Sequence, residues 1–271
     1  MTSLEKSPPR ALTIAGSDCG GCAGIQADLK TFAALGVHGM SVVTAVTAQD
    51  TRRVYLSSDI PLDNIHRQMD AVLEDIGVDA VKTGMLPSVE IIRLVAKKVK
   101  QFNIKSLVVD PIMVSTGGDR LVPDDALEVM KTELFPLATV ITPNLQEAEF
   151  LIHRKINGQQ DLQEAVQEIF GLGSQSVIVK GGHLDDPEQS TDYFYDGETL
   201  ESLMSPRLDS RNTHGSGCTF ASAITAYLAR GLDLGDSTRR AKEYVTEAIR
   251  HSLSLGHGHG PLGHFWKFWK K

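Results

Sequence analysis

The sequence predicts an α/β fold in which helices cover both faces of a doubly wound, mostly parallel sheet. Short runs of β-branched and other apolar residues recur along the chain, and helix-period segments fill the intervals between them. These runs are apolar enough to be buried on both sides, which is typical of central strands. The chain has 271 residues, of which 41% are hydrophobic and 23% charged, so it can bury a core and is neither disordered nor fibrous.

Six apolar runs are the predicted central strands. They lie at Ala11–Gly16, Ser41–Ala48, Ala80–Gly84, Ser106–Asp110, Thr139–Thr142 and Ser176–Gly181. The stretch Tyr193–Leu200 differs, because Asp196-Gly197 between two β-rich segments is a hairpin signal. We therefore expect an antiparallel hairpin at one edge of the sheet, near residues 191–208.

The segments between the strands are the predicted helices. One helix has a single core-facing stripe of Ile25, Leu29, Phe32 and Ala33, and it stops at Gly36. Three later helices open with proline, which suits a first turn because that turn does not need the amide hydrogen. These are Pro61–Ile76, Pro87–Phe102 and Pro123–Leu134, followed by Asn144–Ile152, Gln160–Phe170 and a helix through Phe220, Ile224 and Tyr227.

The C-terminal part and the overall organisation follow the same alternation. The glycine- and histidine-rich run Gly256–His264 is expected to break the last helix. Because no internal repeat, charge block or long linker interrupts the chain, we expect a polar tail over residues 1–10 and one domain over residues 11–271.

Charge and hydropathy exclude two classes of partner. The formal net charge is −7 and no stretch concentrates Lys and Arg, which argues against nucleic-acid binding. Apolar stretches such as Val42–Ala48 fall far short of the ~20 residues that span a bilayer. Three cysteines and the polar start Met1–Arg10 make a reducing cytoplasm the expected compartment. An anionic small substrate stays possible, because backbone amides can hold phosphate without net positive charge.

Two glycine-rich loops are candidates for a phosphate site, because ligands of open parallel sheets bind at the carboxyl ends of strands. Gly16–Gly24 follows the first predicted strand, and Asn212–Cys218 opens a helix. Neither loop is a Walker-type loop, since the chain contains no Gly-Lys dipeptide, and neither fits the dinucleotide fingerprint. Taken alone, each is explained equally well as a tight strand-to-helix connection.

Cysteines provide the sharper local signals. Cys218 lies in a first helical turn, where the helix dipole and nearby amides lower the pKa of a thiol, so its thiolate could accept a proton. From these residues alone, a small buried side chain is the commoner role. Cys19 and Cys22 form a C-x-x-C pair, but a zinc site needs two further ligands, and the histidine run lies at the far end of the chain. Metal binding or thiol redox chemistry at this pair is therefore the less favoured interpretation.

Longer blocks of sequence carry a resemblance to a known family. Ala11–Asp18 and Ala23–Gly36 closely resemble the hydroxymethylpyrimidine/phosphomethylpyrimidine kinases of thiamine biosynthesis, which belong to the ribokinase-like superfamily. Further matching blocks are Thr44–Gln49, Lys82–Met85, Val109–Met113, Ile141–Leu145, Lys180–Leu184, Thr213–Cys218 and Gly256–Pro261. Ordered matches over nearly the whole chain make this signal specific.

The resemblance implies an ATP- and Mg²⁺-dependent enzyme, a homodimer, with one site for two phosphoryl transfers. The first transfer would phosphorylate 4-amino-5-hydroxymethyl-2-methylpyrimidine, and the second would convert its monophosphate to the diphosphate. Gln49 would hydrogen-bond the aminopyrimidine, for which a carboxamide has suitable donors and an acceptor. Asp28 would lie near the ring substituents, and the pocket would be lined by Gly16, Ala23 and Met85.

The same resemblance assigns the chemistry. Gly215, Ser216 and Gly217 would form an anion hole for the transferring phosphoryl group, and Cys218 would be the general base where related sugar kinases have aspartate.

For the nucleotide and the metal, Asn144 and Glu147 would help to place Mg²⁺, with Glu147 acting through water, although Glu147 is equally plausible as a helix-start charge. Asp110 would add a second acidic group, and Lys180 would neutralise ATP phosphates. The segment Ser115–Arg120 would be a flap over the reacting groups.

Two departures from the family pattern leave the substrate open. Cys22 stands where glycine is usual, and Asp50 where asparagine is common. Related enzymes accept pyridoxal or pyridoxine, so a pyridoxal or pyridoxine kinase using the same site is one alternative. A non-catalytic pyrimidine-binding protein is another. The Gly-Ser-Gly-Cys loop together with Asn144 and Glu147 argues against it, since a mere binder needs no phosphoryl stabilisation.

Overall fold

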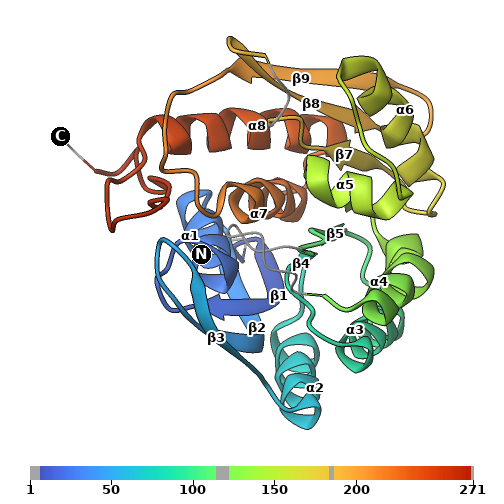
Figure 1. The fold of residues 1–271 in the computed structure, drawn as a ribbon. Coiled ribbons are helices and arrows are strands. Elements are labelled where there is room, and N and C mark those ends of the chain that lie inside the picture. The colour runs from blue at the N-terminus through green and yellow to red at the C-terminus, as the bar shows by residue number, and fades with distance from the viewer. Residues whose placement is uncertain (1–6, 114–121, 183–185, 270–271) are drawn as a thin grey trace, which may run out of the picture.

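The computed structural model describes residues 7–113, 122–182 and 186–269. Over these residues one nine-stranded sheet has the order β3-β2-β1-β4-β5-β6-β7-β8-β9 (Figure 1). The strands are β1 (Arg10–Asp18), β2 (His38–Gln49), β3 (Val54–Asp59), β4 (Ala80–Thr83), β5 (Leu107–Val109), β6 (Val140–Ile141), β7 (Val177–Val179), β8 (Gln189–Tyr195) and β9 (Leu200–Pro206). Strands β1, β2 and β4 to β7 pair in parallel, whereas β3, β8 and β9 pair antiparallel. The predicted sheet is confirmed.

Both edges of the sheet are antiparallel, but only one was predicted. At the β8–β9 turn the Asp196 carboxylate accepts hydrogen bonds from the amides of Glu198 and Thr199, at 2.9 and 2.7 Å, and Gly197 has a φ of +96°. This is the expected hairpin. Strand β3 at the other edge is polar and largely exposed, so its sequence lacks the apolar run by which the central strands are identified.

Eight α-helices lie in the described part of the chain. They are α1 (Gly24–Ala34), α2 (Leu62–Ala71), α3 (Val89–Gln101), α4 (Asp124–Val129), α5 (Leu145–Ile152), α6 (Gln159–Phe170), α7 (Ser216–Ala229) and α8 (Leu234–Arg250). Helices α2 and α4 continue as single wider turns to Ile76 and Leu134, which matches the predicted ends. The expectation for Gly256–His264 is wrong: α8 already ends at Arg250, and the run instead packs against Thr51 beyond β2, where the Gly258 amide donates to the Thr51 hydroxyl at 2.9 Å.

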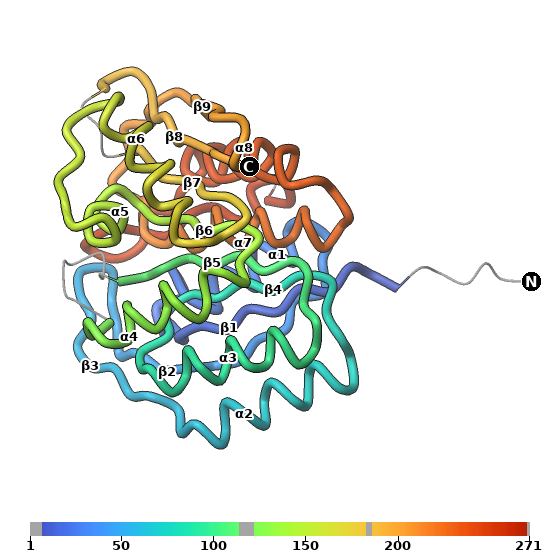
Figure 2. The backbone as a smooth tube through the Cα atoms, turned by 90° about the vertical axis from the view of Figure 1, so that its right-hand side faces the viewer, coloured from blue at the N-terminus to red at the C-terminus, as the bar shows by residue number. Residues whose placement is uncertain are grey.

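The helices form a layer on each face of the sheet. Helices α1, α7 and α8 pack on one face and α2 to α6 on the other, as the two views of the molecule show (Figures 1 and 2). Each layer has its own apolar cluster, and consecutive residues of β7 alternate between them: Val177 and Val179 join one cluster, and Ile178 joins the other. This period of two explains why β7 is apolar at every position.

No helix among the described residues is both long and apolar enough to cross a bilayer.

Candidate active site

A cavity of about 740 Å³ lies beyond the carboxyl ends of the parallel strands. Its walls come from the segments that follow β1, β2, β5, β6 and β7 and from the start of α7. All but one of the predicted site residues line it, namely Gly16, Ala23, Gln49, Met85, Asp110, Asn144, Glu147, Lys180, Gly215, Ser216, Gly217 and Cys218. The fold therefore gathers side chains that are up to two hundred positions apart in the sequence at one edge of the sheet.

The first glycine-rich loop is folded around the carboxylate of Asp18. The amides of Gly20, Cys22 and Ala23 donate to this carboxylate at 2.8, 2.9 and 2.9 Å. Burial pushes the pKa of Asp18 upward, but the nearby His214 and the hydrogen bonds from these amides outweigh it, so the net shift is downward. Asp18 thus stays ionised and fixes the loop that forms one wall of the cavity.

The second loop presses against the first. Gly215 has a φ of +83°, and a Cβ at this position would lie 1.9 Å from the carbonyl oxygen of Cys22. Only glycine fits this approach. The contact brings the start of α7 to the cavity wall formed by the loop after β1.

The start of α7 offers free backbone donors. The amide of Ser216 donates to the Thr213 carbonyl at 3.1 Å, and that of Thr219 to the Gly215 carbonyl at 2.9 Å. Gly217 and Cys218 lie between these two residues, and their amides have no hydrogen-bond acceptor among the described residues. Two free amides at the positive end of a 14-residue helix make a site suited to an anionic phosphoryl group.

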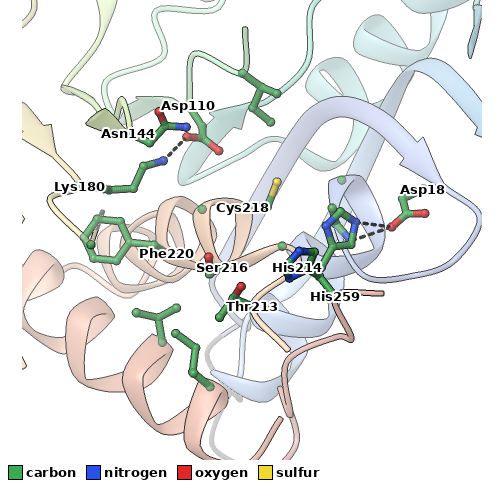
Figure 3. Close-up of a pocket in the computed structure, with 18 of the residues that line it drawn as sticks. Asp18, Asp110, Asn144, Lys180, Thr213, His214, Ser216, Cys218, Phe220 and His259 are labelled. Atoms are coloured by element: carbon green, nitrogen blue, oxygen red, sulfur yellow. Dashed lines mark hydrogen bonds and ion pairs between the residues drawn. The ribbon is translucent and has the colours of Figure 1, made fainter. Parts of the chain in front are cut away.

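Cys218 lies between two polar groups of the cavity. In Figure 3 its sulfur is placed between the Asp110–Lys180 pair on one side and the Asp18–His214 pair on the other. Burial raises the pKa of the Cys218 thiol to about 11; the positive charge of Lys82 opposes this shift, whereas Asp28 and Asp110 add to it. The predicted lowering of this pKa is therefore wrong, because removal from water outweighs the helix start.

Gln49 is held in a defined orientation at the other side of the cavity. Its Nε2 lies 2.9 Å from Nε2 of His214, and its Oε1 accepts from the Thr47 hydroxyl at 3.2 Å. The thiol of Cys19 donates to the Gln49 carbonyl at 3.3 Å, so this cysteine supports the backbone of the same residue. The sequence analysis did not predict His214 as a site residue, although this histidine lies within Thr213–Cys218, one of the blocks that resemble the kinase family.

Lys180, Asp110 and Glu147 form a charged group at the opposite end. Lys180 Nζ lies 3.0 Å from Asp110 Oδ1, which also accepts from Thr142 at 3.0 Å. Glu147 closes a capping box with Asn144, through backbone donations at 2.8 and 2.9 Å. It therefore both starts helix α5 and faces the cavity. Burial raises the pKa of Glu147 to about 7; Lys180 opposes this, and Asp110 adds to it.

Asp28 is the site residue that the structure does not bring to the cavity. Its carboxylate is fully buried, it is absent from the cavity wall, and it pairs with Lys82 at 2.9 Å. The expectation that Asp28 lies near the ring substituents is therefore wrong, because helix α1 directs this side chain into the protein between α7 and β4. The expected flap at Ser115–Arg120 lies outside the described residues.

The cavity extends toward α8, which sequence reasoning did not place in the site. Lys242 on this helix forms a 2.8 Å ion pair with Asp192 of β8, and both residues line the cavity together with Phe220, Val245 and Ile249. An apolar surface beside an ion pair gives room for a second, larger ligand in the same cavity.

Asp18, Cys22 and His214 offer one possible metal ligand each, within 4.8 Å of one another. The Asp18 oxygens already accept three amides, and burial with the nearby Asp18 charge raises the pKa of the Cys22 thiol to about 11. Both facts favour a hydrogen-bonded loop over a metal site. Cys19 is exposed and outside this group, so the C-x-x-C pair does not act as a unit in it.

Known proteins with similar sequences match this chain over nearly its whole length. The family model for phosphomethylpyrimidine kinase matches residues 18–263. A hydroxymethylpyrimidine/phosphomethylpyrimidine kinase of Rhizobium meliloti is 48% identical over 263 residues, which cover 96% of this chain and 98% of that protein. The thiamine biosynthesis bifunctional protein ThiED of Geobacter sulfurreducens is 49% identical over 253 residues, 93% of this chain but only 51% of that longer protein.

Solved structures agree with the sequence matches. The ADP complex of a pyridoxal kinase from Bacillus subtilis superposes with a TM-score of 0.90 at 44% identity, covering 95% of this chain and 98% of that one. The predicted ribokinase-like fold is thereby confirmed.

Replacing Glu147 with glutamine is expected to change how stability depends on pH. Because the pKa of Glu147 rises from 4.5 to about 7 on folding, ionising it costs stability as the pH increases through this window. The free energy of unfolding of Glu147→Gln, minus that of the wild type, should therefore grow between these two pKa values and level off above them. Urea unfolding across this pH range measures the difference.

A control on the same helix should behave in the opposite way. Lys155 and the Ile156 amide lower the pKa of Glu149 against the effect of burial, so Glu149→Gln should lose stability relative to the wild type as the pH rises. A difference for Glu147→Gln that is flat, or that falls with pH, contradicts the buried and protonatable state assigned to this carboxyl.

Proposed function

Because this chain belongs to the phosphomethylpyrimidine kinase family, we propose that it phosphorylates 4-amino-5-hydroxymethyl-2-methylpyrimidine with ATP, and then phosphorylates the monophosphate to the diphosphate. One observation carries the proposal: the free amides of Gly217 and Cys218 and the thiol of Cys218 share a cavity with the carboxamide of Gln49. A phosphoryl site, a base and a heterocycle-binding group are thus combined.

The fixed orientation of Gln49 supports an aminopyrimidine as the acceptor. When Thr47 donates to Oε1 and one Nε2 hydrogen faces His214, a second hydrogen and a lone pair on Oε1 remain. These match a ring nitrogen beside an exocyclic amine. Gly16, Ala23 and Met85 would line the apolar part of this subsite.

Cys218 and the start of α7 would perform the chemistry. The thiolate of Cys218 takes the proton from the substrate hydroxyl while the oxygen attacks the terminal phosphorus of ATP and the bond to ADP breaks. The amides of Gly217 and Cys218, held in place by the Gly215–Ser216 turn, stabilise the charge on the transferring group. In the second cycle the monophosphate oxygen would take the place of the alcohol at the same site.

The residues around Lys180 fit a magnesium ion. Asp110 and Glu147 supply carboxylate oxygens at the cavity. Among the described residues Lys180 is the cation that pairs with Asp110 and acts on Glu147, so a divalent cation with ATP phosphates would balance the local charge. Magnesium, held by Asp110 and through water by Glu147, would reduce repulsion between the phosphates and the acceptor. Lys180 would bind phosphate oxygens, and Asn144 would fix Glu147.

The finer properties of the protein are part of the same proposal. The family resemblance supports a single kinase domain over residues 11–271, a homodimer and a cytoplasmic enzyme that does not bind nucleic acid.

A pyridoxal kinase is the second candidate. The structural likeness to the pyridoxal kinase of Bacillus subtilis favours it, since pyridoxal also carries a hydroxymethyl group that the same base and amides would serve. A protein that binds pyrimidines without catalysis needs neither feature.

An assay of ADP release with three acceptors, offered separately, tests the function. We expect release with the aminopyrimidine alcohol and with its monophosphate, each with a kcat/KM at least about tenfold above that for pyridoxal, because the Gln49 pairing is specific. A preference for pyridoxal would support the second candidate instead, and no ADP with any acceptor would overturn the kinase assignment.

Replacing Cys218 with alanine tests the base. We expect kcat to fall by ~10²–10⁴ while thermal stability stays close to that of the wild type. Because the pKa of the thiol is about 11, wild-type kcat should also rise as the pH is raised above neutrality, and this rise should be lost in the variant. Thr225→Ala, a substitution on the same helix and outside the cavity wall, is the control. A Cys218→Ala enzyme with near-normal kcat would leave this residue a packing role.

A further inference from the structure

We propose that Lys82 is a positioning residue whose buried ammonium group lies beneath Cys218 and stabilises the thiolate of that cysteine. The inference deepens the proposed function and rests on it, because the thiolate matters there as the base for the acceptor hydroxyl. Lys82 is outside the cavity wall, so it would act through Cys218 without touching the substrate.

Lys82 belongs to a fully buried ion pair that joins four elements of the fold. Its Nζ lies 2.9 and 3.1 Å from the two carboxylate oxygens of Asp28, and both side chains have no exposed surface. The hydroxyls of Thr13 and Ser222 donate to the same carboxylate at 2.6 and 2.5 Å. Strand β1, helix α1, strand β4 and helix α7 thus meet at one charged pair.

The hydrogen bond from Ser222 places this pair beneath Cys218. Ser222 follows Cys218 by four positions on α7, so the two side chains lie on the same face of the helix, one turn apart. The Asp28 carboxylate that Ser222 contacts therefore lies one turn deeper than the thiol. Lys82 projects from β4 toward the same point and completes the pair under the cavity floor.

The charged groups around the thiol come from every neighbouring element. Asp28 on α1 and Asp110 after β5 disfavour a thiolate, whereas Lys82 on β4 and the Gly24 amide favour it, and Lys180 after β7 also interacts with it. Of the groups that lower the pKa of Cys218, and so favour its thiolate, Lys82 has the largest effect. It is therefore the main group that offsets the burial of this cysteine.

The surroundings of Lys82 also leave its charge available. Among the described residues Asp28 is its one hydrogen-bond acceptor, although an ammonium group has three donors. A Cβ at Gly84 would lie 3.0 Å from Nζ, so this glycine leaves the space that the ammonium needs. Because a buried ion pair adds little stability over well-packed apolar residues, its position beneath a reactive thiol suggests a functional role.

Alkylation of Cys218 by iodoacetamide tests the proposal without relying on kinase activity. Rates are measured on the full chain between about pH 7 and 9.5, below the thiol pKa, by the mass of the peptide that carries Cys218, which separates it from Cys19 and Cys22. Removing a nearby positive charge raises the pKa of a thiol by about one unit or more, which lowers the fraction of thiolate. Because the remaining thiolate is more nucleophilic, the alkylation rate falls by only about threefold.

The two partners of the pair should have opposite effects. We expect Lys82→Met to slow alkylation of Cys218 by at least about threefold, and Asp28→Asn to accelerate it. A merely structural role predicts acceleration in both variants, since looser packing exposes the thiol. Lys82→Met leaves a buried unpaired carboxylate and could fail to fold. The double variant Lys82→Met/Asp28→Asn therefore repeats the test without an unpaired carboxylate, and its Cys218 should be alkylated more slowly than that of Asp28→Asn alone, from which it differs only in the Lys82 charge.

Lys98→Met is the matched control, because Lys98 is a buried lysine on α3 that is paired with Asp70, outside the cavity wall. Cys218 in the Lys98→Met variant should be alkylated at the same rate as in the wild type. If Cys218 in the double variant were alkylated as fast as in Asp28→Asn, or faster, the proposal would be overturned.

Kinetic assays complete the test. Lys82→Met/Asp28→Asn should have a lower kcat for the aminopyrimidine alcohol than Asp28→Asn, with an unchanged KM. If the wild type transfers no phosphate, the proposed function fails but the alkylation result still decides the role of Lys82.

Discussion

The close contact between two backbone segments fixes the geometry of the whole site. The start of α7 approaches the loop after β1 so closely that Gly215 has no space for a side chain next to the Cys22 carbonyl. The loop keeps its shape because the Asp18 carboxylate binds three of its amides. This contact positions the free amides of α7 and the thiol of Cys218 opposite Gln49, which belongs to a different strand. If the loops moved apart, the proposed phosphoryl site and the proposed heterocycle site would no longer share a cavity.

The same contact also buries the Cys218 thiol, which makes its thiolate harder to form. Packing the start of α7 into the protein removes the Cys218 thiol from water, and the resulting rise in its pKa exceeds what a helix dipole supplies. In our proposal the main compensating charge is that of Lys82, which lies below the thiol in the core. At the far end, Asp110 and Glu147 both lie near Lys180, and we propose that a further cation binds there together with anionic phosphates.

Local patterns predicted the fold well because each central strand is buried on both faces and each helix has one apolar face. Strand β3 was not predicted, since an exposed edge strand needs no apolar run. Most of the predicted site residues line one cavity because they end strands or begin α7, and the topology of a parallel sheet brings such positions together. Asp28 could not be placed in this way: whether a helical carboxylate faces a cavity or a buried lysine depends on the partner Lys82, which lies 54 positions away. The pKa of Cys218 likewise depends on tertiary burial that no local sequence reports.

A crystal structure with ADP, magnesium, aluminium fluoride and the aminopyrimidine alcohol tests the central claim most directly. The account predicts the fluoride group at the amides of Gly217 and Cys218, with the substrate oxygen within hydrogen-bond reach of the Cys218 sulfur and the ring on Gln49. A complex in which the fluoride group lies away from these amides, or in which another side chain contacts the substrate oxygen while the sulfur does not, would contradict it.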